Sequence, residues 1–168
     1  MIRVEEAKDR NAVHALNASV FATPAEADLV DLLGAQSPQA VSLVAEQDGE
    51  IVGHIMFTPV GLVGHRDLKM MGLAPMAVAP RHQRQGIGSA LVHAGLNRCR
   101  RLGFGAVVVL GHADYYPRFG FTPAAHFGIS CEFSVPDDAF MVRELSPDYL
   151  RGAQGMIRYA PAFRTISP

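Results

Sequence analysis

The segment from Leu73 to Leu102, LAPMAVAPRHQRQGIGSALVHAGLNRCRRL, constrains the fold of this chain most strongly. Residues Leu73 to Val78 are apolar and suit a pleated strand, which Pro80 would end. From Ile87 onward, apolar residues recur at spacings of three and four, which predicts an amphipathic helix. Gly103 occupies a C-cap position that would end this helix. The segment therefore predicts a strand, a tight turn and a long helix.

Two glycines, Gly86 and Gly88, lie where this helix is expected to begin. Glycine inside a helix costs about 1 kcal/mol relative to alanine, so a pair in one turn indicates that the backbone approaches something closely. The first N–H groups of a helix lack intrahelical partners and carry the positive end of its dipole, which suits a phosphate. A tight strand-to-helix junction without a ligand explains the glycines equally well.

Two familiar phosphate-binding motifs do not match this turn. No Gly-Lys-Ser or Gly-Lys-Thr sequence follows a glycine after four residues, so the P-loop is absent. The dinucleotide fingerprint fails because Leu91 stands where its third glycine belongs.

The order of residues through the turn resembles the acetyl-CoA motif of the GNAT superfamily of N-acetyltransferases. The matching residues are Ala77, Val78, Pro80, Gln83, Gly86 and Gly88. A second family feature, an aromatic residue four places before Gly-Phe, is supplied by the segment from Tyr116 to Phe121. The run LGHADYYPRFGF and the ending MIRYAPAF further resemble the YhbS-like branch of predicted acetyltransferases. The resemblance covers most of the chain and is firmest from Leu73 to Phe121.

This resemblance implies how acetyl-CoA is bound. Backbone N–H groups near Met76 to Val78 would hold the thioester carbonyl and then the oxyanion, and Arg84 to Ser89 would hold the pyrophosphate. The implied cofactor-binding residues are Met76, Ala77, Val78, Gln83, Arg84, Gln85, Gly86, Ile87, Gly88 and Ser89. The implied reaction is direct attack of a primary amine on acetyl-CoA within a ternary complex.

Catalytic roles follow from the same resemblance, each beside a structural alternative. Tyr116 matches the family tyrosine that donates a proton to the departing sulfur. The alternative is that its ring only packs in the core. Tyr115 matches the family tyrosine less well. His112 lies at a predicted strand end and could accept the proton of the amine, because imidazole titrates near neutral pH. A structural histidine is equally compatible. Phe21 and Glu26 would border the acceptor site, although core packing also explains Phe21.

The remaining pattern predicts a mixed α/β fold. Ala106 to Leu110 is almost wholly apolar, which is typical of a strand buried on both faces and parallel to Leu73–Val78. Asp48-Gly49 predicts a hairpin between two apolar segments. Pro75 predicts a local irregularity in its strand. The expected fold class is GNAT-like: a central twisted sheet with helices on both faces and a splayed parallel strand pair.

Other elements are expected from local signals. Threonine, proline and glutamate at 23, 24 and 26 indicate a helix that is capped by Thr23 and begins at Pro24. His54 is interpreted as a satisfied histidine within a strand. The further expected elements are a strand at 2–7, a helix at 10–21, strands at 41–46 and 51–60, a turn at 61–67, a strand at 69–78, a short helix or turn at 113–119, and strands at 121–129, 139–144 and 155–159.

Composition restricts the partners. The 15 basic and 16 acidic residues give a net charge of −1, which argues against a nucleic-acid partner. No apolar run is long enough for a membrane span, and the N-terminus, MIRVEEAKDR, lacks the apolar stretch of a signal peptide, so we expect a cytoplasmic protein that is not bound to a membrane. Cys99 and Cys131 sit at unrelated positions and suggest free thiols, and the histidine spacing predicts no metal site. The length suits one domain over residues 1–168.

Two functions remain open at this stage. The first is an acetyl-CoA-dependent N-acetyltransferase acting on the amine of a small molecule or a protein, as a monomer or a homodimer. The second is a module that binds acyl-CoA without catalysis and serves as a sensor or regulatory subunit. Tyr116 favours the enzyme, because a binding module has no need of an acid beside the departing sulfur.

Overall fold

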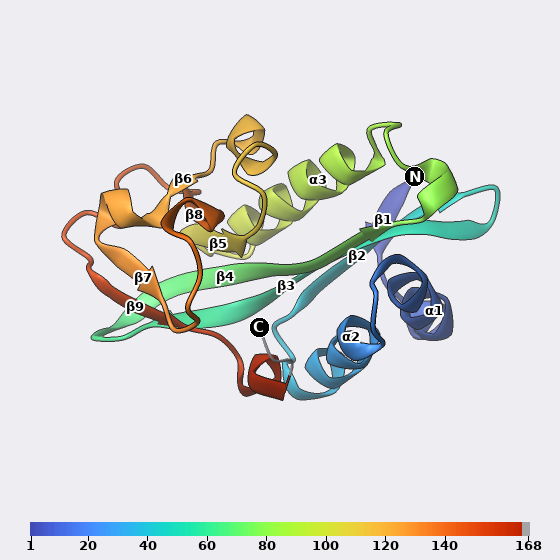
Figure 1. Cartoon of the computed structure of the whole chain (residues 1–168), viewed down its shortest axis with the longest axis horizontal. Coiled ribbons are helices and arrows are strands. Elements are labelled where there is room, and N and C mark those ends of the chain that lie inside the picture. The colour runs from blue at the N-terminus through green and yellow to red at the C-terminus, as the bar shows by residue number, and fades with distance from the viewer. Residues whose placement is uncertain (166–168) are drawn as a thin grey trace.

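The computed structural model describes residues 1–165, in which one sheet is covered by helices on both faces (Figure 1). The strands are β1 (Ile2–Val4), β2 (Val41–Gln47), β3 (Glu50–Leu62), β4 (His65–Val78), β5 (Ala106–Leu110), β6 (Thr122–Pro123), β7 (Ile129–Cys131), β8 (Phe140–Glu144) and β9 (Gly155–Arg158). The α-helices are α1 (Arg10–Val20), α2 (Ala25–Gln36) and α3 (Ile87–Arg101). Short 3₁₀ segments are η1 (Ala7–Asp9), η2 (Pro80–His82), η3 (Tyr116–Phe119), η4 (Ala124–Phe127), η5 (Asp137–Ala139) and η6 (Pro161–Thr165).

The strand order is β1-β2-β3-β4-β5-β8-β6, with β9 pairing to the far end of β3 and to β7. Strands β1 to β4 are antiparallel neighbours, whereas β4 and β5 are parallel and joined through α3. Helix α3 lies against one face of the sheet, and α1 and α2 lie against the other (Figure 1). This arrangement confirms the mixed α/β, GNAT-like fold class.

The parallel pair β4–β5 separates part-way along β4. Pairing runs from Met70 opposite Ala106 to Leu73 opposite Val109 and then stops, although β4 continues to Val78. On its other side, β4 has a register shift against β3 between the Ile55 and Phe57 positions, across from Pro75. A bulge bends a strand locally, so the irregularity predicted from Pro75 is confirmed at the point where the strands diverge.

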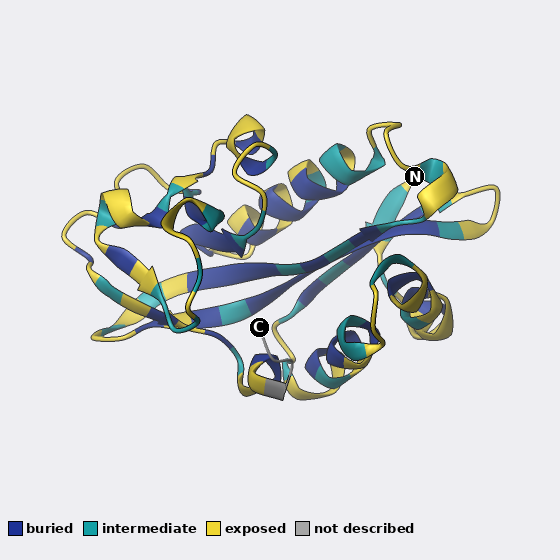
Figure 2. Cartoon of the chain, viewed as in Figure 1, coloured by how far each residue is buried: buried dark blue, intermediate teal, exposed yellow. Residues whose placement is uncertain are grey.

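Two apolar clusters form the core, one on each face of the sheet (Figure 2). The cluster beneath α3 contains Phe57 and Leu91, both fully buried. The opposite cluster joins α1, α2 and the C-terminal segment through residues such as Leu33 and Tyr159. Removal of this apolar surface from water is the main favourable term in folding. The two clusters hold helices on both faces of one twisted sheet.

Helix α3 approaches β3 closely through glycine. A Cβ added at Gly95 would lie 2.2 Å from Cε1 of Phe57, and one added at Gly53 would lie 3.0 Å from side-chain atoms of Ile87 and Leu91. Packed interiors leave no room for such an atom. These two glycines therefore fix how near α3 lies to the sheet.

Two turns confirm the local expectations. The β2–β3 hairpin turns at Asp48 and Gly49, whose φ angles are 51° and 78°, as a two-residue primed turn requires. Helix α3 ends at Arg101, and Gly103 beyond it has a φ of 90°, typical of a glycine C-cap.

The expected strand over 121–129 is wrong. Only Thr122–Pro123 pair, with β8, and the chain then forms η4 before β7 begins at Ile129. Pro123 has no N–H to donate, and Gly128 has a φ of 72°. Both features interrupt a regular strand between residues 121 and 129.

Several boundaries also differ from expectation. Strand β1 ends at Val4, because the side chains of Glu6 and Asp9 cap the η1 turn that follows. The loop expected over 61–67 is only a two-residue turn with Gly64 at a φ of 88°, so β3 is longer and β4 begins at His65. Helix α2 begins at Ala25, with Pro24 rather than Thr23 as its cap. Within residues 1–165, no helix has the length and apolar character needed to cross a bilayer.

We expect Gly95→Ala to destabilise the protein by about 1–3 kcal/mol, because the new methyl group overlaps the ring of Phe57. Gly34→Ala is the matched control, since no described atom lies within 4 Å of a Cβ there and alanine favours a helix by up to about 1 kcal/mol. Urea unfolding of both variants checks this. Equal stability of Gly95→Ala and the wild type would contradict the proposed close packing.

Candidate active site

The turn between β4 and α3 presents a run of free backbone donors. None of the N–H groups from Arg84 to Ser89 donates a hydrogen bond to another residue in the described part of the chain. Arg84 and Gly86 have φ angles of 64° and 85°, and Gly86 is the N-cap of α3. The N–H groups and the helix dipole together favour an anion here.

The end of β4 is tied to this turn. The side-chain amide of Gln83 donates a hydrogen bond to the carbonyl oxygen of Val78 at 3.0 Å. Arg81 forms an ion pair with Glu50 at the β2–β3 hairpin. These contacts hold the donor run next to the last residues of β4.

Space around the two glycines differs. Within residues 1–165, nothing lies within 4 Å of a Cβ added at Gly86, which leaves open room above the turn. A Cβ added at Gly88 would lie 3.1 Å from the Tyr115 hydroxyl, 3.7 Å from Cε of Met76 and 3.8 Å from Cγ2 of Val78. Gly88 is therefore the point where β4, α3 and the segment before η3 meet.

Tyr116 is buried, with 8% of its surface exposed. Its ring packs across Gly111, where an added Cβ would lie 2.3 Å from Cε2, and edge-on to Phe121 at 5.7 Å between centroids. Burial raises the pKa of Tyr116 to about 12, so the phenol keeps its proton at neutral pH. Its hydroxyl has no hydrogen-bond partner in residues 1–165 and is free to donate.

His112 follows β5 and is exposed. Its carbonyl oxygen accepts hydrogen bonds from the N–H groups of Tyr115, at 3.1 Å, and Tyr116, at 3.4 Å. The backbone of His112 thus starts the turn that carries both tyrosines. Its imidazole has no hydrogen bond to another described residue, and its role as a base stays a prediction.

Phe21 and Glu26 lie at the α1–α2 junction, and both are partly buried. The N–H of Phe21 donates to the carbonyl oxygen of Asn17 at 3.2 Å, and the Glu26 carboxylate accepts from Thr23 at 3.5 Å. Within the described chain, neither side chain has a hydrogen bond, ion pair or ring contact with β4, α3 or η3. Their contact with an acceptor therefore remains a prediction.

Together these elements provide an anion-binding turn, a strand whose end has no neighbour on its β5 side, and a protonated phenol. This combination suits transfer of a group from a carrier that contains phosphate. Residues 7–121 match the family model described as acetyltransferase (GNAT) family. The chain belongs to the GNAT family.

Curated relatives extend over nearly the whole chain. It is 38% identical to YhbS of Escherichia coli strain K12, named as an uncharacterized N-acetyltransferase, over 164 residues that cover 97% of this chain and 98% of YhbS. It is also 38% identical to YjhQ of the same strain, likewise an uncharacterized N-acetyltransferase, over 139 residues that cover 80% of this chain and 77% of YjhQ.

Two solved GNAT structures are similar to this chain and contain CoA or acetyl-CoA. The crystal structure of Escherichia coli YhbS in complex with CoA has a TM-score of 0.93 and 37% identity, covering 98% of this chain and 91% of that one. A Brucella melitensis GNAT acetyltransferase in complex with acetyl-CoA has a TM-score of 0.79 and 32% identity, covering 97% of both chains. These relatives bind CoA or acetyl-CoA.

Behind β4, this GNAT protein contains a buried polar network that sequence analysis did not find. His54 is fully buried and lies directly across from Ala77. Asn17 Nδ2 donates to the carbonyl oxygen of Val13 at 3.0 Å and lies 3.2 Å from His54 Nδ1, which therefore accepts. His54 Nε2 then donates to Ser42 Oγ at 2.8 Å. His54 is thus a satisfied histidine, as expected.

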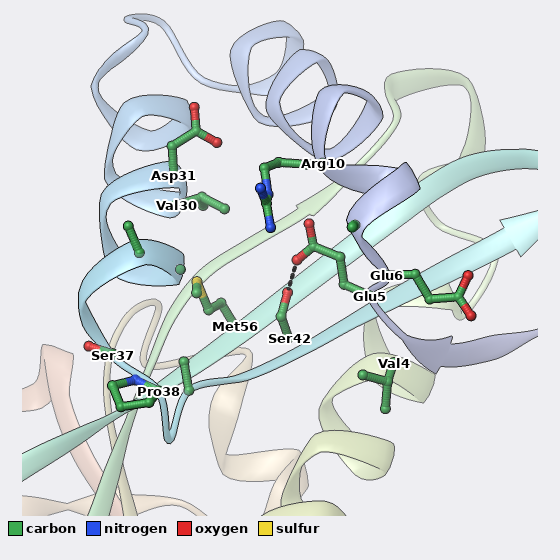
Figure 3. A pocket seen from close by; sticks show the side chains of 14 residues that line it. Val4, Glu5, Glu6, Arg10, Val30, Asp31, Ser37, Pro38, Ser42 and Met56 are labelled. Atoms are coloured by element: carbon green, nitrogen blue, oxygen red, sulfur yellow. Dashed lines mark hydrogen bonds between the residues drawn. The ribbon is translucent and has the colours of Figure 1, made fainter.

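The network reaches the surface at a cavity of about 350 Å³ between α2, β1 and β2 (Figure 3). There Ser42 Oγ donates to a Glu5 carboxylate oxygen at 2.5 Å. Arg10 points its guanidinium group into the cavity, with Asp31 on the opposite wall (Figure 3). Because directly bonded members are up to 37 residues apart in sequence, no local motif predicts the network.

One cluster of side chains has the residue types that could bind a metal ion, which the sequence analysis did not expect. The side chains of His14, Asp28 and Asp31 place ligand atoms within 4.8 Å of one another across α1 and α2. His14 Nδ1 is 2.8 Å from Asp31 Oδ2, so an ion pair already accounts for this contact, and both aspartates are exposed. The absence of a metal requirement stays a prediction.

We expect stability to fall as pH drops from about 6.5 to about 4, because burial lowers the pKa of His54 from the usual histidine value of 6.5 to about 4. Between these values the unfolded chain binds more protons than the folded one, which favours unfolding by at most about 1.4 kcal/mol per pH unit. His54→Gln removes this titration. Urea unfolding at several pH values should therefore show a smaller loss in the variant; parallel curves for both proteins would contradict the assignment.

Proposed function

We propose that this chain is an acetyl-CoA-dependent N-acetyltransferase that transfers the acetyl group to a primary amine of a small molecule or a protein. The run of unpaired N–H groups from Arg84 to Ser89 is the observation that carries the proposal. It follows a strand that leaves its parallel partner after Leu73. A chain 37% identical to this one binds CoA with the same fold, which supports a CoA site here.

Different residues of the chain bind the diphosphate and the acyl group of acetyl-CoA. The donor run and the positive end of the α3 dipole hold the diphosphate, aided by the side chains of Gln83, Arg84 and Gln85. Within residues 1–165, no strand pairs with β4 on its β5 side beyond Leu73, so the backbone groups of Met76 to Val78 that are not bonded to β3 are available to the acyl oxygen. Donors that are already oriented stabilise the oxyanion without reorganisation during the reaction.

Bound acetyl-CoA supplies the activated acyl group, and the amine attacks it directly. Tyr116 donates the proton to the departing sulfur, and its raised pKa keeps that proton in place until it is needed. His112, or water ordered near it, accepts the proton of the amine. Phe21 and Glu26 border the acceptor at the α1–α2 junction.

The first test is calorimetric titration with acetyl-CoA, CoA and ATP, followed by a thiol-release assay across a panel of amines. We expect selective binding of CoA and acetyl-CoA and thiol release with one class of amine. Binding without release on any amine would favour the non-catalytic acyl-CoA sensor. Absence of CoA binding by the folded protein would overturn both functions.

We expect Gly86→Glu to abolish acetyl-CoA binding, because a carboxylate would enter the open space above the donor run. Gly86→Gln is the matched control: it shares the bulk and the strain of a side chain at a φ of 85° but adds no charge. Calorimetry should show weaker binding by Gly86→Gln and none by Gly86→Glu. Wild-type affinity in a folded Gly86→Glu variant would refute the diphosphate site.

Tyr116→Phe should preserve acetyl-CoA affinity and lower kcat by about 10²–10⁴-fold, the usual range for loss of a general acid. The ring contacts with Gly111 and Phe121 do not involve the hydroxyl, so the fold should be retained. Steady-state kinetics with an identified amine give the measurement. An unchanged kcat would remove Tyr116 from the acid role.

A further inference from the structure

The ring of Tyr115 is held on several sides. It meets the rings of Tyr116 and Phe119 edge-on at centroid distances of 5.1 Å and 5.2 Å. The guanidinium carbon of Arg118 lies 4.6 Å from the centroid of the Tyr115 ring. Such aromatic and cation–π contacts favour one orientation of the ring. The hydroxyl of Tyr115 therefore has a defined position.

That hydroxyl lies at the first turn of α3 and has no hydrogen-bond partner in residues 1–165. Its distance from a Cβ built on Gly88 is 3.1 Å, and Gly88 contributes one of the free N–H groups. Tyr115 is only partly buried, so its hydroxyl can meet a ligand on this turn. The Tyr115 ring thus places an unpaired hydroxyl donor beside the unpaired N–H groups of the α3 turn.

We propose that Tyr115 is a further cofactor-binding residue, whose hydroxyl donates a hydrogen bond to a diphosphate oxygen of CoA held by the α3 turn. This inference rests on the proposed function, since it assigns one more contact to the same site. A phenol donates to an anionic oxygen with charge assistance, which makes the bond stronger than one between neutral groups. A diphosphate that spans the free N–H groups around Gly88 comes within reach of this hydroxyl.

Arg118 positions Tyr115 for this role. Its Nε donates to the carbonyl oxygen of Tyr115 at 2.9 Å, and a terminal nitrogen lies 3.4 Å from the carbonyl oxygen of Asp114. These bonds keep the guanidinium group over the Tyr115 ring. They also keep a positive charge against the face of the Tyr115 ring.

The same contact explains why position 88 is glycine. A methyl group at this position would lie 3.1 Å from the Tyr115 hydroxyl, so the hydroxyl would have to move by a few tenths of an ångström from the position that its ring contacts favour. That shift would lengthen the proposed hydrogen bond. Gly88→Ala should therefore weaken the same hydrogen bond that Tyr115→Phe removes.

Calorimetric titration of CoA into Tyr115→Phe tests the proposal, with Tyr116→Phe as the neighbouring control. We expect Kd for CoA to rise about tenfold in Tyr115→Phe, the loss of one charge-assisted hydrogen bond, and to change less than about twofold in Tyr116→Phe. Titration with 3′-phosphoadenosine 5′-diphosphate, which has the diphosphate but no pantetheine arm, should show the same tenfold loss. A loss with CoA alone would overturn the assignment to the diphosphate.

The double variant Gly88→Ala/Tyr115→Phe separates a direct contact from a general structural effect. If the hydroxyl acts at Gly88, the two substitutions are not additive, and the double variant binds CoA about as weakly as Tyr115→Phe alone. Additive losses would overturn the proposed contact. Wild-type affinity in Tyr115→Phe would refute only the role of Tyr115, whereas no CoA binding by the wild-type protein would refute the proposed function itself.

Discussion

The end of pairing between two parallel strands is the constraint on which the rest of this structure depends. Strands β4 and β5 remain together only to Leu73 and Val109, and β4 then continues alone on that side for five residues. A continuous parallel ladder would occupy the backbone groups that the proposed chemistry requires. The bulge near Pro75 lets β4 keep its pairing with β3 while it leaves β5. The sheet therefore stays continuous through β3 and β4 at the point where β4 separates from β5.

Helix α3 must lie correctly for its first turn to meet the end of β4. Its distance from the sheet is set by Gly53 and Gly95, which admit neighbouring side chains where a Cβ would overlap them. The polar network around His54 supports β4 from the other face through its neighbour β3. Close packing on one side and the hydrogen bonds of His54 on the other thus surround the strand segment that carries Met76 to Val78.

Sequence reasoning succeeded where local chemistry determines the structure. The α3 helix, the Asp48-Gly49 hairpin and the irregularity at Pro75 each follow from signals within a few residues, and all are present. The strand predicted over 121–129 is wrong because apolar composition alone does not show which residues find a partner strand. The sequence offers no reason to assign Tyr115 a role in binding. Only the folded chain brings the Tyr115 hydroxyl to Gly88, which is 27 residues away in sequence.

Strand β9 has a consequence for the order in which the chain assembles. It pairs Arg158 with Gly61 and Ile157 with Leu62, so it joins segments almost a hundred residues apart. During synthesis the β2–β3–β4 meander can form early from neighbouring segments, whereas β9 can join only after the whole stretch from β3 to β9 has been made. In the folded protein β9 pairs with this end of β3 and with β7. Before β9 docks, these two strands therefore expose the backbone groups that it later pairs, and open sheet edges are general templates for pairing with another strand.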